Sequence, residues 1–314
     1  MSSRLAAAPW WAQAALVWAA SRAWAWAVFT TVGRQQGPGP WGDGALGYLA
    51  FTGTWDSDWY ERIAREGYPE SVPRDEAGRA QENAWAFYPV FPLLVRALTG
   101  LTGAGWDAAA SAVSLAASLA AALLVHRLFL RFAAPDTALW GLAFVAFNPV
   151  APVLQVPYAE SLHLALLAGA LLLVSRGRCL AAAPVVLVMC LTRPAGVPFA
   201  AALGITWLVR TAARHRDGRL RRAADAFDGL FVLAVFSCAA ALAWPAIAWW
   251  VTGEPTAYTE TETAWRGGGL VPVVPWFDAG TDLFGPVAGL AAPVLLVAGG
   301  VLVLRSRVVR ERLD

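Results

Sequence analysis

The sequence predicts an all-α membrane protein, a polytopic bundle of about eight helices with a long external first loop. Hydrophobic residues make up 58% of the 314 residues, charged residues make up 15%, and the mean hydropathy is +0.51. A water-soluble domain of this length could not cover so much apolar surface, so the composition indicates an integral membrane protein. We interpret the whole chain, residues 1–314, as a single membrane domain.

Apolar runs of about 20 residues, the length that crosses a bilayer, recur along the chain. We expect helices near residues 9–32, 108–127, 136–156, 158–175, 227–251 and 286–304. The apolar stretch 179–210 contains the sequence TRPAG at 192–196, which predicts a break. Two short helices that enter and leave by the same face therefore bring the count to eight. The first run is too long for a signal peptide and contains Arg22, so we interpret it as the first membrane helix.

All 24 basic residues are arginine, and their positions test this topology. With eight helices and a cytoplasmic N-terminus, the arginine clusters all fall on one side, and the acidic loops 33–107 and 252–285 fall on the other. The clusters are Arg127 and Arg131, Arg176 and Arg178, Arg210 to Arg222, and Arg305 to Arg312. Because cytoplasmic loops carry excess basic residues, we expect a multi-pass cell-membrane protein with both termini in the cytoplasm. Residues 210–226 then form a basic loop facing anionic lipid, and no nucleic-acid partner is expected.

Residues 56–67, within the first external loop, predict a short helix. Asp56 or Ser57 can cap its start and Gly67 can end it. Two oppositely charged pairs at i,i+4 spacing, Glu61 with Arg65 and Arg62 with Glu66, are expected to stabilise the helix. Tyr60, Ile63 and Ala64 share one stripe, so we expect the helix to lie flat in the membrane interface. Residues 86–96 are apolar but carry two prolines, and they predict an interfacial or re-entrant segment beneath it.

Several ionisable residues of this chain have both a structural and a functional interpretation. Asp56 can be a helix cap or a general base, and Asp58 can be a first-turn carboxylate favoured by the helix dipole or a base. Glu160 and Arg193 are expected on the same side of the membrane as Asp56, either as a structural ion pair or as part of a site. Their placement together is a prediction of the topology.

Other polar residues at membrane depth have mainly structural interpretations. Arg22 is expected to pair with an acid or to reach the interface, Asn148 to lie within the third helix, and His163 to be a core histidine. The three cysteines and three histidines lack metal-ligand spacing, and no phosphate-binding loop, nucleophile elbow or HExxH sequence is present.

Eight short sequences occur in an order that resembles the PIG-V family of membrane mannosyltransferases. They are WDS at 55–57, IA and GY within 63–68, AFYPVFP at 86–92, NP at 148–149, PYAES at 157–161, TRPAG at 192–196 and AWR at 264–266. The PIG-V family contains the second mannosyltransferase of GPI-anchor synthesis and bacterial relatives, within the GT-C superfamily of polytopic glycosyltransferases. The resemblance extends from Trp55 to Arg266.

The resemblance implies that mannose is transferred from polyprenyl-phosphate-mannose to a lipid-linked or glycan acceptor on the extracytoplasmic face, with inversion. Asp56 would be the general base, with Asp58 as a second candidate. Arg193 and then Arg266 would hold the donor phosphate. The residues expected to bind substrate are Trp55, Tyr158, Glu160 and Trp265. No cofactor or metal is expected, because a phosphate leaving group with a single ester can be held by arginine.

Two other classes of protein fit the same apolar pattern. A transporter or lipid flippase would use Arg22, Glu160 and Arg193 along a translocation path, but it does not require the long loop 33–107, and no inverted repeat is evident. A scaffold protein would keep the fold without activity. The residues Trp265 and Arg266 can equally be ordinary aromatic and basic residues of the membrane interface.

Overall fold

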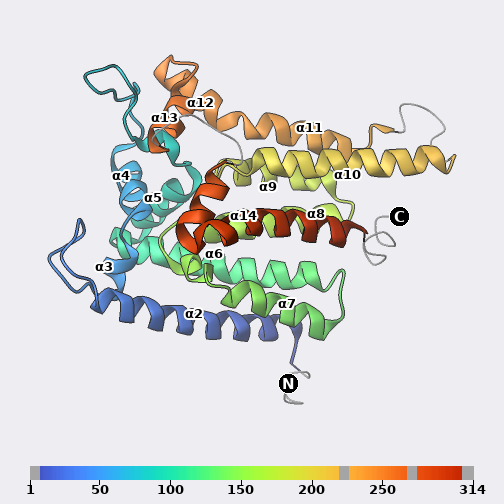
Figure 1. The fold of residues 1–314 in the computed structure, drawn as a ribbon, viewed down its shortest axis with the longest axis horizontal. Helices are drawn as coiled ribbons and strands as arrows, with labels where there is room; N and C mark the ends of the chain where they lie inside the picture. Colours follow the sequence, from blue (N-terminus) through green and yellow to red (C-terminus); the bar gives the residue numbers. More distant parts are fainter. Residues whose placement is uncertain (1–7, 219–225, 267–273, 306–314) are drawn as a thin grey trace.

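The computed structural model describes residues 8–218, 226–266 and 274–305, and these form helices joined by turns and loops without any extended β-strand (Figure 1). The helices are α2 (Trp10–Arg34), α3 (Tyr48–Thr52), α4 (Asp56–Glu66), η1 (Ala84–Ala86), α5 (Val90–Thr102), α6 (Trp106–Phe129), α7 (Pro135–Phe147), η2 (Ala151–Gln155), α8 (Glu160–Ser175), α9 (Cys179–Cys190), α10 (Gly196–Arg216), α11 (Gly229–Ala241), α12 (Ala243–Thr252), α13 (Ala257–Trp265) and α14 (Val274–Arg305).

Three helical stretches of the described residues are long and apolar enough to cross a membrane. They are Trp106–Phe129, Gly196–Arg216 and Gly229–Thr252, the last formed by α11 and α12 together. Several shorter helices, including α7, α8 and α9, are also apolar. The all-helical class predicted from the sequence is therefore confirmed, and the apolar helices indicate a membrane protein.

The breaks between helices follow proline and glycine positions. The predicted break at 192–196 is confirmed, because α9 ends at Cys190 and α10 begins at Gly196. A Cβ atom on Gly196 would lie 2.6 Å from the Cβ of Ala241, so only glycine permits this approach of α10 to α11. Beyond the break α10 runs on to Arg216, so the first residues of the expected basic loop 210–226 are helical.

The expected single helix over 136–156 is wrong. The helix α7 ends at Phe147 because Asn148 precedes Pro149, and the residue before a proline disfavours the helical conformation. Asn148 closes a turn instead, accepting a hydrogen bond from the backbone of Val150 and donating one to the carbonyl of Val145. Asn148 therefore lies at a helix end and not within a helix.

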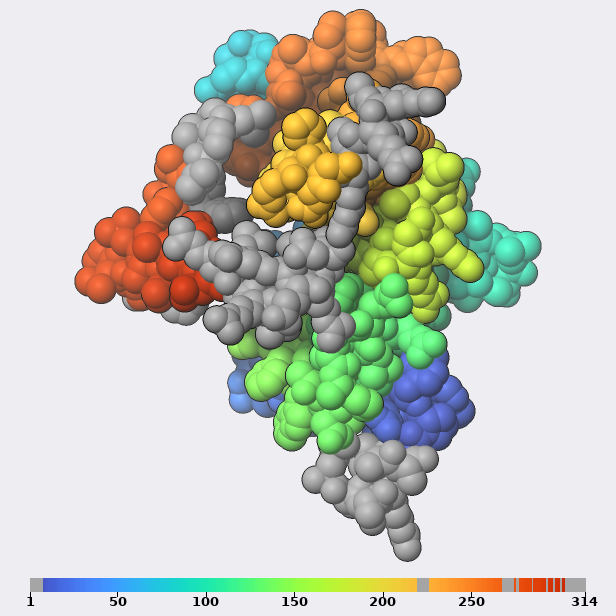
Figure 2. All heavy atoms as spheres, turned by 90° about the vertical axis from the view of Figure 1, so that its right-hand side faces the viewer, coloured from blue at the N-terminus to red at the C-terminus, as the bar shows by residue number. Residues whose placement is uncertain are grey.

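The bundle has two different ends (Figure 1). The short helices α3, α4, α5 and α13 gather at one end, which we call the loop end. The C-terminal ends of α6, α8, α10 and α14 lie at the other, which we call the arginine end. Figure 2 looks onto the arginine end, where α2 and α14 lie at different edges of the bundle. Six of the expected arginines, Arg219, Arg221, Arg222, Arg307, Arg310 and Arg312, lie outside the described residues.

The helix α6 occupies the centre, packed against α2, α5, α7 and α8. Its small buried residues, such as Ala110 and Ala121, let neighbouring backbones approach closely. At the loop end, the start of α6 packs against α4 and α5 to form a core that includes Tyr60, Phe91 and Trp106. This core packs against the buried face of α4 and fixes the position of that helix in the bundle.

Candidate functional site

The helix α4 begins with a strained residue. Trp55 has φ 59° and ψ −122°, and it is the one non-glycine residue with positive φ in the described part of the chain. Such a conformation costs roughly 1–3 kcal/mol and persists only where the surrounding structure enforces it. Because Asp56 follows immediately, the strain sets the direction in which the helix and its first carboxylate begin.

The expected capping role of Asp56 or Ser57 is wrong. The N-cap of α4 is Trp55, Asp56 is the first helical residue, and no side chain caps the helix by a hydrogen bond. The side chain of Ser57 is buried and accepts a hydrogen bond from Trp106 Nε1 at 3.4 Å. The Asp56 carboxylate is thus not engaged by the backbone of its own helix.

The rest of α4 follows the prediction in part. The helix ends at Glu66 with Gly67 as C-cap, and Tyr60, Ile63 and Ala64 are buried. Glu61 pairs with Arg65 as expected, but Arg62 pairs with Asp58 at 3.1 Å and not with Glu66. The apolar stripe packs against α5 and α6, so protein side chains cover the face that was expected to lie in the membrane interface.

Glu160 and Arg193 form an ion pair at this end of the bundle. Glu160 is the first residue of α8, where a negative charge is favoured by the helix dipole. Arg193 lies in the break between α9 and α10. Their side chains are only 23% and 33% exposed, so water screens the pair incompletely. This pair was one of the two interpretations that the sequence left open.

The segment around Tyr158 joins the ion pair to the start of α4. The Tyr158 hydroxyl donates a hydrogen bond to the carbonyl of Thr54 at 2.9 Å, and Ser114 of α6 donates one to the carbonyl of Tyr158 at 3.4 Å. The charges of Asp56, Glu160 and Arg193 act on one another and on Tyr158. Three segments that are distant in sequence therefore meet in one polar cluster, which we call the Asp56 site.

Asp56 is half-buried at this site, and burial raises the pKa of its carboxyl group. The positive charge of Arg193 opposes that rise in pKa but does not cancel it. A carboxylate in such an environment is a stronger base than one in water. Perturbed carboxylates of this kind are concentrated at functional sites.

Aromatic rings form a wall beside the Asp56 site. Trp59 stacks on Phe87 with ring centroids 5.6 Å apart and meets the edge of Trp265 at 5.3 Å. Trp265 also donates a hydrogen bond from Nε1 to the carbonyl of Asn83 at 3.3 Å. Trp265 is therefore partly buried in this aromatic cluster. It links α13 to α4 and to the loop that follows α4.

Three residues predicted for the site face away from the polar cluster. Asp58 forms its ion pair with Arg62 and its side chain is 46% exposed. Arg266 pairs with Glu262 at 3.2 Å, and its side chain is 53% exposed. Trp55 is exposed and its ring lies 6.0 Å from that of Trp41. Of the two aspartates, the fold gathers Asp56 with Glu160 and Arg193 and leaves Asp58 at the surface.

Arg22 pairs with backbone carbonyls and not with the expected acid. It is 7% exposed and donates hydrogen bonds to the carbonyls of Ala151 at 3.1 Å and Ala146 at 3.5 Å. Backbone carbonyls on either side of the break at Asn148, one in α7 and one in η2, thus take the place of the expected acid. Arg22 holds this break against α2.

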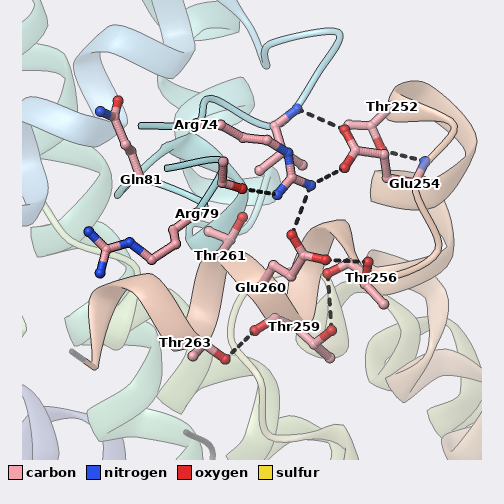
Figure 3. A network of polar contacts seen from close by, with 12 residues as sticks. Arg74, Arg79, Gln81, Thr252, Glu254, Thr256, Thr259, Glu260, Thr261 and Thr263 are labelled. Carbon is pink, nitrogen blue, oxygen red and sulfur yellow. Dashed lines mark hydrogen bonds and ion pairs between the residues drawn. The ribbon is translucent and has the colours of Figure 1, made fainter. Parts of the chain in front are cut away.

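A second charged cluster at the loop end was not predicted from the sequence (Figure 3). Arg74 reaches from the loop after α4 to Glu254 and Glu260, next to α12 and in α13. A groove of about 580 Å³ lies beside it, lined by residues of the Arg74–Ala80 turn and of α13. Sequence periodicity gives no signal for such a contact, because Arg74 and Glu254 are 180 positions apart.

Comparisons with known proteins give no relative for this chain: no family model, no curated protein and no solved structure matches it.

Proposed function

We propose that this protein is a membrane glycosyltransferase of GT-C type that transfers mannose from polyprenyl-phosphate-mannose to a lipid-linked or glycan acceptor. The observation that carries the proposal is the Asp56 site, where a half-buried carboxylate not used for capping interacts electrostatically with the Glu160–Arg193 ion pair. The resemblance of the WDS, PYAES and TRPAG sequences to PIG-V enzymes supplies the reaction class, and these three sequences are the ones that meet at the site.

The chemistry assigns one role to each charged group. Asp56 accepts the proton of the acceptor hydroxyl as the oxygen attacks C1 of the sugar. The new bond joins the acceptor oxygen to C1, and the bond from C1 to the phosphate oxygen breaks. The electron pair leaves with the lipid phosphate, which Arg193 holds by charge-assisted hydrogen bonds. A single displacement of this kind inverts the anomeric centre, and Glu160 orients Arg193.

The same proposal includes the membrane topology. The chain would cross the membrane eight times, with the loop end extracytoplasmic and both termini cytoplasmic. The arginine end supports this orientation, because cytoplasmic loops are rich in basic residues. Arg127, Arg176 and Arg214 lie at or next to the helix ends that meet there. External labelling of a single cysteine at Gly78, but not of one at Gly218, is the expected pattern. The reverse pattern would overturn the orientation.

Mannose transfer in membranes tests the activity directly. Membranes that contain the protein are supplied with labelled polyprenyl-phosphate-mannose and an extract of lipid acceptors. We expect transfer by the wild type and by Glu66→Gln, a surface control on the same helix, and a loss of roughly 10²- to 10⁴-fold in Asp56→Asn. Full transfer by Asp56→Asn would exclude Asp56 as the base, and a loss confined to Asp58→Asn would move that role to Asp58.

A transporter or flippase makes a different prediction in the same membranes. It would move the lipid between leaflets without forming a new glycosidic bond, and Asp56→Asn would leave the labelled product pattern unchanged. Buried Arg22, which the transporter hypothesis places on a translocation path, is held by backbone carbonyls of α7 and η2. Its contacts therefore support a structural role.

A further inference from the structure

Four buried polar atoms without a hydrogen-bond partner belong to Glu160 itself or to residues that lie near the Glu160–Arg193 ion pair in space or in sequence. They are the Tyr60 hydroxyl, Glu160 Oε2, the Ser161 hydroxyl and His163 Nδ1. Only five other such atoms occur in the described residues, on Thr30, Ser111, His126 and Thr211. Buried polar groups are normally paired, and each exception needs a cause. The concentration of exceptions at one place is therefore a property of this site.

Tyr60 is the largest of these groups and its orientation is fixed by packing. Its side chain is 0% exposed, and its ring meets the edges of Phe87 at 5.3 Å and Phe91 at 5.1 Å. Its hydroxyl lies close to the Arg193 guanidinium, but the two groups do not meet the geometry of a hydrogen bond, and the charges of Arg193, Glu160 and Asp56 all act on it. A phenylalanine would fill the same ring position, so the hydroxyl is not required by the packing of α4.

We infer that the Tyr60 hydroxyl is a ligand-binding group of the Asp56 site, which donates a hydrogen bond to a phosphate oxygen bound at Arg193. The inference rests on the proposed function, because that phosphate is the leaving group of the donor. A hydroxyl beside a guanidinium adds a second, differently directed donor to an anionic oxygen. Arg193 is one-third exposed, so a phosphate can bind it from the open side. Because Tyr60 is fully buried, a hydrogen bond from its hydroxyl to that phosphate requires a side-chain shift.

Ser161 extends the same argument to α8. Its side chain is 1% exposed, and its hydroxyl is adjacent in sequence to the ion-paired Glu160. The ligand class is the phosphate ester of a lipid.

The chain offers a matched control for Tyr60. The hydroxyl of Tyr88 is also buried at the loop end, but it is hydrogen-bonded to the hydroxyl of Tyr258 at 3.0 Å. A hydroxyl with a partner stabilises the fold, whereas a buried hydroxyl without one is costly. The two Tyr→Phe variants should therefore differ in the sign of their effect on thermal stability.

Thermal unfolding of the purified full-length protein in detergent is the first arm of the test. We expect Tyr60→Phe to raise Tm by about 2 °C and Tyr88→Phe to lower it by about the same amount. A lower Tm for Tyr60→Phe would mean that the hydroxyl is held by a structural partner, and it would overturn the inference. Ser161→Ala should follow Tyr60→Phe in direction.

Ligand binding and transfer form the second arm. Polyprenyl-phosphate-mannose and polyprenyl phosphate should each raise the Tm of the wild type, and the rise should be at least halved in Tyr60→Phe. The donor KM should increase about tenfold in Tyr60→Phe, the effect of losing one hydrogen bond to a charged group, and should not change in Tyr88→Phe. An equal rise in Tm with inorganic phosphate alone would identify a general phosphate site and would overturn the lipid-phosphate assignment.

The two hypotheses fail in different ways. Binding of polyprenyl phosphate that depends on Tyr60, without any mannose transfer by the wild type, would remove the proposed enzyme and keep the phosphate site. Transfer by the wild type with unchanged KM and Tm in Tyr60→Phe would keep the enzyme and remove the role of Tyr60.

Discussion

Two arginines at the loop end each join segments that are far apart in sequence, and they differ in how fully their acidic partners are bonded. Arg74 contacts Glu254 and Glu260 (Figure 3). Both acids have further partners, since Glu254 accepts from the backbone of Val72 and Glu260 accepts from Thr256. Arg193 contacts Glu160, whose second oxygen is buried and has no partner.

The Arg74 cluster has the properties of a structural contact, whereas the Arg193 cluster has those of a site that can take a ligand. The carboxylates around Arg74 are bonded through both oxygens, and this cluster fastens the loop after α4 to α12 and α13. The cluster around Arg193 keeps unpaired hydroxyl and carboxylate oxygens in a partly buried place, which reduces stability unless a ligand completes it. We therefore interpret the Arg74 cluster as a structural attachment, and the proposed function places the ligand at the Arg193 cluster.

Removal of Arg193 should have the largest effect. Arg193→Ala leaves Glu160 as an unpaired, mostly buried charge, so we expect a loss of roughly 3 kcal/mol in the free energy of unfolding. Mannose transfer should fall roughly 100-fold because the leaving phosphate loses its main cation. Denaturant unfolding and initial transfer rates measure the two effects.

A second substitution isolates the charge at Glu160. The double variant Arg193→Ala with Glu160→Gln should recover much of the lost stability without recovering transfer. Recovery of transfer in the double variant would show that Arg193 serves only to neutralise Glu160.

The pH dependence of transfer sharpens the assignment of Asp56. Burial raises the pKa of Asp56, so its carboxylate takes up a proton at a higher pH than an exposed aspartate, whose pKa is about 3.9. The protonated form cannot accept the acceptor's proton, so the transfer rate should fall up to about tenfold per pH unit below the raised pKa. Arg193→Ala removes the charge that opposes the rise and should move this acid limb to still higher pH. An acid limb that is the same in both proteins would exclude Asp56 as its source.

Strain at Trp55 can be measured with two variants of that residue. Both Trp55→Gly and Trp55→Ala remove the ring contact with Trp41, but only glycine accepts φ 59° without steric cost. We therefore expect Trp55→Gly to be more stable than Trp55→Ala by about 1 kcal/mol in chemical denaturation. Equal stability of the two variants would mean that the backbone of this residue relaxes when its side chain is removed.

Removal of Arg74 should have the smallest effect. Its ion pairs with Glu254 and Glu260 are about one-third exposed, and such pairs contribute little. Arg74→Ala should shift Tm by less than about 2 °C and leave the transfer rate within about twofold of the wild type. A loss of transfer as large as that of Arg193→Ala would place Arg74 in the site and would end the distinction between the two clusters.

Local sequence determined much of the fold. The end of α4 at Gly67 and the break at 192–196 follow from interactions between residues no more than four positions apart. The apolar runs determined the all-helical class for the same reason, because helix periodicity and proline breaks are local properties. The same local rule accounts for the end of α7 at Phe147, because Asn148 precedes Pro149.

Only the tertiary structure decided which polar groups meet. Glu160 and Arg193 are 33 positions apart, and Arg74 and Glu254 are 180 apart, so no periodicity relates either pair. Asp56 and Asp58 are equivalent in a linear pattern, but α4 packs so that Asp56 faces Arg193 and Asp58 faces Arg62. The Tyr60 hydroxyl lacks a hydrogen-bond partner for the same reason. Whether a buried hydroxyl is paired depends on which donors and acceptors the neighbouring helices place next to it.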